Sequence, residues 1–285
     1  MSGSPPVACA CAIFSGLDIL IPRHVDTASG ELPFFALGQD RVLEFPDKTA
    51  KEELNSDLRI ATFDFEGTPY SSAELEEDRS LHCSTCIRIP LRQFVGSVPQ
   101  RTASFVLKAK AFSHWAYQTR YCSFCGTSLV QGLTREEERA RFCPSCHRIF
   151  FPRISPAIIV LVHKGDTMLL AHNAKVPGTR HGLIAGFVEP GETLEETVHR
   201  EVMEEAGIEI YPPRYIRSQP WPFPDSLMLA YEADYKSGEA RPDGEEIDHL
   251  GWYTPETMPE IPPPGSVARS LIERFIAKQR DDSTD

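Results

Sequence analysis

The alternation of apolar and polar residues divides the chain into a strand-rich first part and a mixed second part. Before residue 100, short apolar runs stand between turn residues, as is typical of β-strands; they cover residues 12–21, 34–38, 41–45, 59–65 and 87–95. Phe105, Ala109, Phe112 and Ala116 then recur at helical spacing, with Trp115 beside them. We therefore expect a small β-rich domain that ends in a helix and has a binding or dimerising role.

Strands and helices alternate in the second part. Apolar runs predict strands at residues 156–162, 167–171, 182–188, 227–235 and 250–253, the first two joined by a turn at 163–166. Residues 194–206 and 267–280 have the apolar spacing of helices, and Gly207 ends the first of them. This order predicts an α/β sandwich with a mixed sheet. We divide the chain into a β-rich domain (1–117), a cysteine-rich segment (118–153) and the α/β domain (154–285).

Composition and charge indicate which kinds of partner the protein can bind. The net charge of −12 repels nucleic acid at long range, but residues 106–153 carry eight Lys and Arg against three Glu. An RNA could follow this basic stretch, with Arg139 and Arg141 at its phosphates. The chain has no apolar run of 18 residues and no secretory signal at its start, so we expect a cytoplasmic protein with reduced thiols.

Four cysteines have the spacing of a zinc ribbon. Cys122-x2-Cys125 and Cys143-x2-Cys146 are separated by 17 residues, and Gly126 suits the tight turn of the first pair. Four thiolates fill a tetrahedral shell and leave no place for water, so the pattern predicts one structural Zn²⁺ per chain. The alternative is four unrelated buried thiols. A second zinc at Cys9, Cys11, Cys83 and Cys86 is a further hypothesis, against which these residues could be free thiols.

The helix at 194–206 concentrates carboxylates on one side. Thr193 and Glu196 form a capping box that starts it. At about 100° per residue, Glu201 and Glu205 point in nearly the same direction, at the edge of the apolar stripe. Carboxylates crowded there repel one another unless a cation neutralises them, and oxygen ligands suit Mg²⁺ or Mn²⁺. The alternative is an acidic surface helix.

Residues 186–208 resemble the signature of the Nudix hydrolase superfamily at every defined position. These positions are Gly186, Glu192, Arg200, Glu201, Val202, Glu204, Glu205, Gly207 and Ile208. The resemblance implies a metal-dependent pyrophosphohydrolase with an α/β/α Nudix sandwich. It implies that the catalytic residues are Glu192, Glu201, Glu204 and Glu205. It also implies a Mg²⁺ or Mn²⁺ site at Ala185, Glu201, Glu205 and Glu246, with Glu245 as an alternative to Glu246. Which carboxylate is the general base stays open.

The segment Ser218–Ser226, SQPWPFPDS, points to the substrate. Its prolines restrict Trp221 and Phe223, whose flat faces suit stacking on a base or on nicotinamide; the alternative is a proline-rich surface loop. The segment resembles an element of the NADH pyrophosphatase branch of the superfamily, which has the same order of domains. This resemblance implies a homodimer. It implies substrate contacts at Glu138, Phe151, Phe187, Gln219, Pro220, Trp221, Pro222, Phe223, Pro224, Asp225, Ser226 and Ala268. A tyrosine is common in the family where Phe151 stands.

The function implied is hydrolysis of the pyrophosphate bond of NADH and NAD⁺, giving nicotinamide mononucleotide and AMP. Removal of an NAD cap from RNA, by the same chemistry, is the first alternative. A different class is a non-catalytic dinucleotide sensor or a zinc-ribbon binding module. The intact Glu201, Glu204 and Glu205 argue against that class, because a sensor does not need the metal-binding carboxylates.

Overall fold

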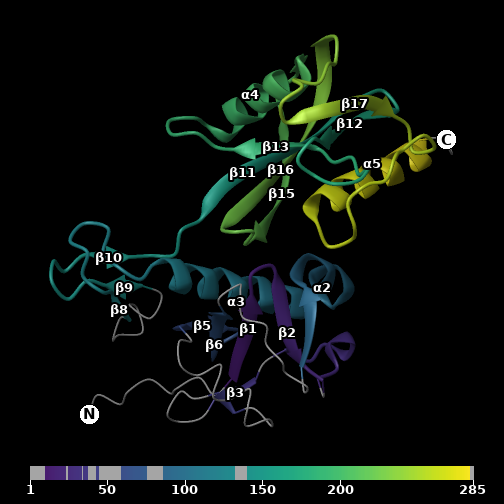
Figure 1. The fold of residues 1–285 in the computed structure, drawn as a ribbon. Coiled ribbons are helices and arrows are strands. Elements are labelled where there is room, and N and C mark those ends of the chain that lie inside the picture. The colour runs from purple at the N-terminus through teal and green to yellow at the C-terminus, as the bar shows by residue number, and fades with distance from the viewer. Residues whose placement is uncertain are drawn as a thin grey trace. The chain divides into compact units, whose positions relative to one another are not determined.

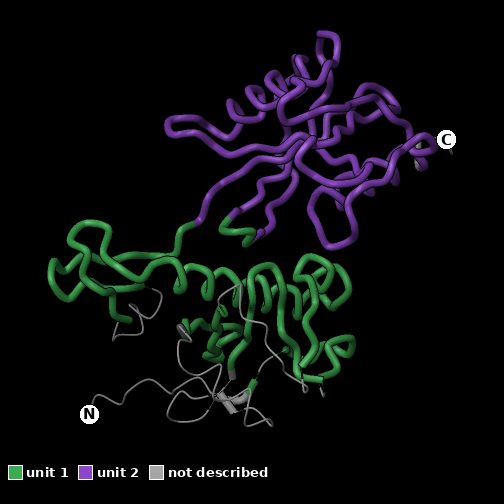
Figure 2. Tube along the Cα trace, in the orientation of Figure 1, with its two compact units in different colours: residues 1–153, 222–225 green, residues 154–221, 226–285 purple. Residues whose placement is uncertain are grey.

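A computed structural model describes residues 10–23, 25–33, 35–37, 43–44, 59–75, 86–131 and 140–282. The chain forms two compact units (Figure 2). Unit 1 contains residues 1–153 and 222–225, and unit 2 contains residues 154–221 and 226–285. None of the helices in the described part of the chain has the length and apolar character needed to span a lipid bilayer.

Unit 1 is built on a sheet that has seven strands in its described part. The central strand β1 pairs with three strands. Strands β2 and β3 are antiparallel to it, and β6 is parallel to it. The elements are β1 (Ala10–Ser15), β2 (Asp18–Pro22), the 3₁₀ helix η1 (Thr27–Ser29), β3 (Phe35–Leu37), β4 (Leu43–Glu44), β5 (Arg59–Phe65), β6 (Thr68–Leu75), β7 (Cys86–Pro90), α2 (Leu91–Ser97) and α3 (Gln100–Gln118).

The strands expected in this unit were partly wrong in their bounds. The run 12–21 is a hairpin of β1 and β2, because Gly16 adopts φ +55° and turns the chain. The run 87–95 changes from strand to helix after Pro90. Strand β6 was not predicted, since its residues alternate weakly between polar and apolar. The prediction of β5 is confirmed.

Helix α3 provides the core of unit 1. Phe105 and Ala109 are fully buried against aromatic residues of the sheet, and Ala116 is also buried. The Phe105 ring lies 5.3 Å from the Phe65 ring in an edge-to-face arrangement. The helix predicted from this spacing is therefore confirmed, and Figure 1 shows it running along the sheet.

The cysteine-rich segment folds as three short strands, β8 (Val130–Gln131), β9 (Arg141–Phe142) and β10 (Ile149–Phe150). Arg141 is buried here: it donates a hydrogen bond to Thr119 O at 2.9 Å and lies over the Trp115 ring. The proposal that it contacts RNA is therefore wrong, because its guanidinium group stabilises the ribbon. Arg139 lies outside the described residues.

Unit 2 is an α/β/α sandwich around a mixed sheet. Its elements are β11 (Ser155–Lys164), β12 (Thr167–Asn173), β13 (Ile184–Phe187), α4 (Leu194–Ala206), β14 (Ile208–Ile210), β15 (Arg214–Trp221), β16 (Ser226–Gly238), β17 (Ile247–Tyr253) and α5 (Val267–Asp282). The sheet order is β14-β16-β11-β12-β17, with β13 on β11 and β15 on β16. Strands β11 and β16 are parallel, whereas β11 and β13 are antiparallel.

The central strand β11 is buried on both faces, which explains its continuous apolar run. Ile158 and Val160 belong to the core under α4, whereas Ile159 and Leu161 belong to the core under α5. The two helices thus cover opposite faces of the sheet (Figure 1). This arrangement confirms the predicted sandwich.

The segment 218–226 is a hairpin end rather than a loop between elements. Gln219, Pro220 and Trp221 lie on β15, and Trp221 pairs with Ser226 at the start of β16. The alternative of a proline-rich surface loop therefore does not describe these three residues. Pro220 is tolerated on the strand because β15 is an edge strand of this sheet.

Candidate active site

Helix α4 positions the acidic side chains and has a defined beginning and end. Thr193 accepts a hydrogen bond from Glu196 N at 3.2 Å, and the Glu196 carboxylate accepts one from Thr193 N at 2.8 Å. This is the predicted capping box. Gly207 ends the helix with φ +68°. Because both ends are fixed, the side chains on the helix keep a fixed register against the sheet.

Arg200 connects three glutamates. Its guanidinium group donates hydrogen bonds to Glu192 at 2.6 and 2.9 Å, to Glu201 at 2.8 Å and to Glu204 at 3.0 Å. A further hydrogen bond, of 3.0 Å, reaches the backbone oxygen of Phe187 on β13. The pair with Glu204 spans one turn of the helix, whereas Glu192 and Phe187 lie outside α4. Arg200 therefore joins α4, the preceding loop and the sheet.

The Glu192 carboxylate accepts hydrogen bonds from three residues. Besides Arg200, the backbone N–H of Glu189 and the hydroxyl of Thr197 donate to its carboxylate, at 3.0 and 2.9 Å. The hydrogen bonds from Arg200, followed by the one from Glu189 N–H, lower the pKa of Glu192 to about 2. A carboxylate with so low a pKa is a weak base. Its placement favours holding Arg200 over taking a proton.

Glu201 is buried against the backbone of β13. Its side chain lies directly on Gly186, where an added Cβ would come within 1.9 Å of the carboxylate carbon. Only glycine leaves room for a carboxylate at this point. Burial raises the pKa of Glu201, although Arg200 lowers it in part. The glycine of the signature is thus explained by the space that the Glu201 side chain needs.

Glu205 is buried one turn further along α4, with 6% of its surface exposed. In the described part of the chain no side chain donates a hydrogen bond to its carboxylate. Burial, and next the charges of Glu201 and Glu246, raise its pKa to about 8. A buried carboxylate beside other carboxylates and without a donor fits a cation-binding position. Glu201 and Glu205 therefore suit Mg²⁺ or Mn²⁺.

Glu246 faces the same group of carboxylates from the loop before β17. Its charge raises the pKa of both Glu201 and Glu205, whereas Glu245 is not among the larger causes for either. The charge of Glu246 thus acts on both buried glutamates more strongly than that of Glu245, which makes Glu246 the better candidate for a further metal ligand. Asp243 accepts hydrogen bonds from the backbone N–H groups of residues 245, 246 and 247, and so shapes this loop.

The remaining site residues of unit 2 lie at the ends of its strands. Phe187 is exposed at the end of β13, with 55% of its surface accessible. The side-chain amide of Gln219 makes two hydrogen bonds within the protein. It donates to Gly265 O at 2.8 Å and accepts from Val267 N at 2.7 Å. These bonds connect β15 to the first turn of α5, where Ala268 lies. Ser226 is buried at the start of β16.

The other predicted substrate residues belong to unit 1. Phe151 is 65% exposed at the end of the ribbon. Phe223 packs on the core of unit 1, where the Arg92 guanidinium group lies 4.8 Å from the centre of its ring. Asp225 forms an ion pair of 3.5 Å with Arg153. Pro222 is buried and Pro224 is exposed in the same segment. Glu138 lies outside the described residues.

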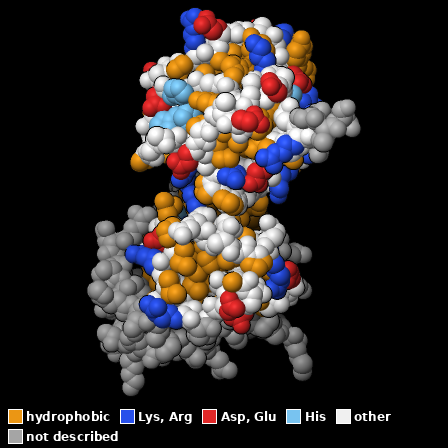
Figure 3. Space-filling model, turned by 90° about the vertical axis from the view of Figure 1, so that its right-hand side faces the viewer, with side chains coloured by type: hydrophobic (Ala, Val, Ile, Leu, Met, Phe, Trp, Pro, Cys, Tyr) orange, Lys and Arg blue, Asp and Glu red, His pale blue; other side chains and the backbone are white. Residues whose placement is uncertain are grey.

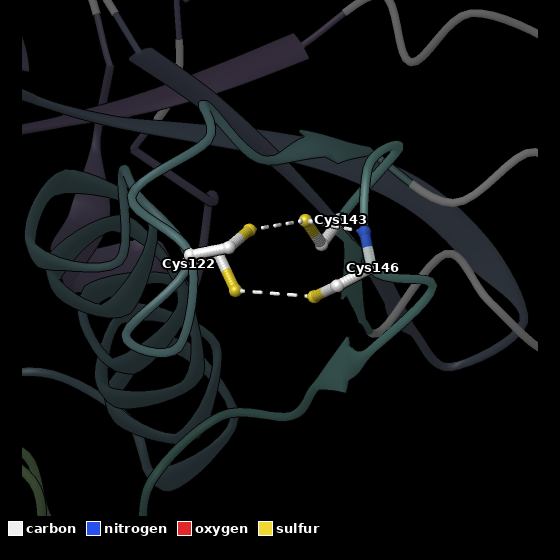
Figure 4. Close-up of side chains that lie close together, drawn as sticks. Cys122, Cys143 and Cys146 are labelled. Carbon is white, nitrogen blue, oxygen red and sulfur yellow. Dashed lines mark hydrogen bonds between the residues drawn. The ribbon is translucent and has the colours of Figure 1, made fainter.

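The ribbon brings its four cysteine sulfurs together. All four lie within 4.8 Å of one another, and the Cys122–Cys146 and Cys125–Cys143 pairs are 3.5 and 3.4 Å apart (Figure 4). Tetrahedral Zn²⁺ with bonds of about 2.3 Å needs sulfurs about 3.8 Å apart, so the cluster fits this ion. Each pair is followed by a left-handed residue, Gly126 at φ +74° and His147 at φ +58°. Both turns are those of a zinc knuckle.

The hypothesis of a second zinc site is contradicted at one of its four proposed ligands. Cys86 is disulfide-bonded, so its sulfur has no thiolate to offer a metal ion. Cys11 is fully buried in the core of unit 1. Cys9 and Cys83 lie outside the described residues. The expectation that the cysteines beyond the ribbon are reduced is also wrong for Cys86.

Three features of the site were missed in the sequence. Lys175 pairs with Glu246 at 2.5 Å, and no spacing rule connects residues so far apart. The contact of the buried His181 with His249 on β17, at 2.8 Å between ring nitrogens, was also missed. The role of Asp243 could have been inferred, because Asp243-Gly244 is a turn signal next to Glu246.

Comparisons with known proteins identify relatives for most of the chain. The model of the NUDIX domain family matches residues 152–275. The protein named NAD-capped RNA hydrolase NudC from Pseudomonas syringae pv. syringae is 42% identical over 215 residues, covering 75% of this chain and 76% of that protein. The protein of the same name from Stutzerimonas stutzeri is 42% identical over 189 residues, covering 66% and 67%. That from Pectobacterium atrosepticum is 47% identical over 157 residues, covering 55% and 59%.

Among solved structures, a NUDIX hydrolase from Nitrosomonas europaea matches with a TM-score of 0.49 and 21% identity. The match covers 57% of this chain and 93% of that one.

Proposed function

This chain belongs to the Nudix hydrolase superfamily and is an enzyme, and from that premise we propose that it hydrolyses the pyrophosphate bond of NADH and NAD⁺. The products are nicotinamide mononucleotide, reduced or oxidised, and AMP. The observation that carries the proposal is the buried Glu205, which lies beside Glu201 and Glu246 without a donor to its carboxylate in the described part of the chain.

We assign the catalytic Mg²⁺ or Mn²⁺ to the carboxylates of Glu201, Glu205 and Glu246, with the backbone oxygen of Ala185. Such an ion, when bound, neutralises the pyrophosphate oxygens and lowers the pKa of a water molecule. The residues of the chain supply the rest. Arg200 holds Glu201 and Glu204 at fixed distances, so less reorganisation is needed when the substrate enters.

The water molecule must lose a proton as its oxygen attacks phosphorus and the bridging P–O bond breaks. One of the active-site carboxylates takes this proton, and Glu192 is the least suited of them because the hydrogen bonds from Arg200 hold its pKa at about 2. Glu204 is exposed and assists through Arg200. Glu192, with a pKa of about 2, acts as a positioning residue that holds Arg200.

The rings of the substrate require flat apolar partners. Phe187 at the end of β13 and Trp221 at the end of β15 supply them in unit 2. The amide of Gln219 holds the start of α5, so we propose that this residue contributes to substrate binding by fixing Ala268. Phe151, Phe223 and Asp225 are assigned to substrate from the family resemblance alone.

The experiment that tests this function is product analysis with NADH, NAD⁺ and NAD-capped RNA, each under Mg²⁺ and under Mn²⁺. We expect AMP and nicotinamide mononucleotide from the dinucleotides, and no turnover after chelation of divalent ions. Products that retain the pyrophosphate bond would overturn the proposal. Turnover unchanged by chelation would refute the assignment of the metal ion.

Removal of NAD caps from RNA is a second candidate function, favoured by the printed name of the relatives. The basic residues between positions 106 and 153 support RNA binding less than their number suggested, because Lys110 and Arg141 are both buried. On the face drawn in Figure 3, basic and acidic side chains of the described residues alternate and form no continuous basic patch. Arg148 remains exposed on the ribbon, over the exposed ring of Phe124. An RNA would therefore meet Arg148 before Arg141.

We also propose that the enzyme is a homodimer, as the family resemblance implies. The ribbon presents large apolar side chains to solvent, among them Phe124, Ile149 and Phe151. Exposed apolar groups of this kind are typical of surfaces that bind another protein. Light scattering combined with size-exclusion chromatography tests this, and a mass of one chain would contradict it.

A further inference from the structure

We infer that Lys175 is a substrate-binding residue of the active site with two successive partners. In the free enzyme its ammonium group holds the Glu246 carboxylate. When Glu246 exchanges it for a divalent cation, the ammonium group binds a phosphate oxygen of the substrate. The inference rests on the proposed function, because it takes Glu246 as a metal ligand.

The contacts place Lys175 at the edge of the carboxylate group. Lys175 Nζ lies 2.5 Å from Glu246 Oε1. The neighbouring backbone N–H of Ala174 donates to Glu246 O at 2.8 Å. The loop between β12 and β13 thus lies against the loop before β17. The ammonium group is thereby brought next to a carboxylate whose charge also reaches Glu201 and Glu205.

The loop does not depend on this ion pair for its position. Asn173 accepts a hydrogen bond from Lys175 N at 2.9 Å through its side chain, and one from Val176 N at 2.9 Å through its backbone oxygen. His172 lies between Asp248 Oδ1, at 2.6 Å, and Gly178 O, at 2.8 Å. These bonds hold both ends of the loop. The ammonium group of Lys175 is therefore available for another role.

Lys175 and Arg200 are the two cations that contact the acidic side chains assigned to catalysis, among the residues that the structure describes. They differ in how firmly they are held. Arg200 makes hydrogen bonds to three glutamates and to a backbone oxygen, and its side chain is 22% exposed. Lys175 contacts Glu246 alone among these glutamates, and its side chain is 68% exposed. Exposed pairs of this kind change an equilibrium by about fivefold or less, so Lys175 can be exchanged.

The exchange changes the affinity for the cation and the affinity for the substrate in opposite directions. A divalent cation must displace the ammonium group from Glu246, so Lys175 weakens the binding of that cation to the free enzyme. The displaced ammonium group remains beside the place where the pyrophosphate oxygens must lie, so Lys175 strengthens substrate binding. A residue that only held the loop would have the reverse effect on the cation, since its loss would loosen Glu246.

The test compares Lys175→Met, which keeps the length of the stem and removes the charge, with Lys175→Arg and with the control Arg180→Gln. Arg180 is on the same loop and carries the same charge, but pairs with Glu260. The first measurement is the Mn²⁺ affinity of the free enzyme by electron paramagnetic resonance. The second is kcat and KM for NADH. Melting curves check that each variant is folded.

For Lys175→Met we expect Mn²⁺ to bind about 2- to 5-fold more tightly, and KM to rise on the order of 10-fold with a smaller change in kcat. Lys175→Arg should restore KM, and Arg180→Gln should leave both values near those of the wild type. If Lys175→Met binds Mn²⁺ with unchanged or weaker affinity, or leaves KM unchanged, the inference is refuted while the proposed function stands. A wild-type enzyme that binds no Mn²⁺ would refute the proposed function and this inference together.

Discussion

The Cα atom of Gly186 lies directly beneath the carboxylate of Glu201. A methyl group at Gly186 would meet the carboxylate carbon at 1.9 Å and its oxygen atoms at 1.9 and 2.3 Å. No real Cβ contact is so short, so either the side chain or the strand would have to move. The position of the Glu201 carboxylate therefore depends on a glycine on the neighbouring strand.

Gly186→Ala should displace the Glu201 carboxylate and lower kcat by about 10²-fold, as loss of a metal ligand implies. Overpacking should cost about 1–3 kcal/mol of stability without loss of the fold. Gly182→Ala is the matched control, because a Cβ there meets nothing within 4 Å. Steady-state kinetics and urea denaturation measure both quantities. Equal activity of the two variants would show that Gly186 is not required for this reason.

Glu201→Gln and Glu205→Gln should each lower kcat by about 10²-fold or more while the protein remains folded. The amide keeps the shape of the side chain but neither binds a divalent cation strongly nor accepts the proton. Glu195→Gln is the control, since Glu195 is exposed on the same helix. Near-normal turnover in either active-site variant would contradict the assignment.

The ribbon should contain about one zinc ion per chain, as its four thiolates imply. Cys143→Ser should lower the melting temperature, because Cys143 is fully buried within the ribbon. Chelation of Mg²⁺, by contrast, should abolish activity and leave the melting curve nearly unchanged. Metal analysis and calorimetry test both statements. The reverse pattern would mean that the structural and catalytic roles belong to the opposite sites.

Trp221→Ala should lower kcat/KM for both NADH and NAD-capped RNA by roughly 5- to 150-fold, because stacking of a ring is worth about 1–3 kcal/mol. Tyr215→Ala is the control: this aromatic residue is on the same strand, and its ring packs edge to face against Tyr231 instead. A loss confined to one substrate would indicate that the other does not stack on this strand.

Glu74 in unit 1 should make stability depend on acid pH. Burial alone would raise its pKa, but hydrogen bonds and charge from His114 and Lys110 outweigh burial and lower the pKa. Because the pKa in the folded protein is below that of the unfolded chain, the stabilisation is present at neutral pH. It is lost as the pH falls through the folded pKa. The free energy of unfolding, measured in urea between pH 7 and pH 3, should show this loss. The loss should be smaller in Glu74→Gln, in which only the other carboxylates with lowered pKa values, such as Glu192, still contribute to it.

Glu74→Gln should also destabilise unit 1 by about 3–5 kcal/mol at pH 7, because it leaves the buried ammonium group of Lys110 without its counter-charge. The double replacement Glu74→Gln with Lys110→Met should recover part of this free energy. A single replacement without effect would show that the buried pair contributes nothing to stability.

The sequence by itself determined those features that depend on local spacing. The capping box at Thr193, the direction shared by Glu201 and Glu205, and the two cysteine knuckles follow from helix and turn geometry over a few residues. The strand β11 was predictable for the same reason, since a strand buried on both faces must be apolar throughout.

Contacts between distant segments were decided only by the tertiary structure. Lys175 lies against Glu246 because β12 and β17 are neighbours in the sheet, although 70 residues separate them. Arg141 was expected at the surface. Its burial depends on the ring of Trp115 in α3 and on the backbone oxygen of Thr119, which follows the helix. The run 12–21 looked like one strand, and whether Gly16 turns the chain depends on which strands are there to pair with it. In each case the outcome depends on the energy of packing between segments, which no local pattern contains.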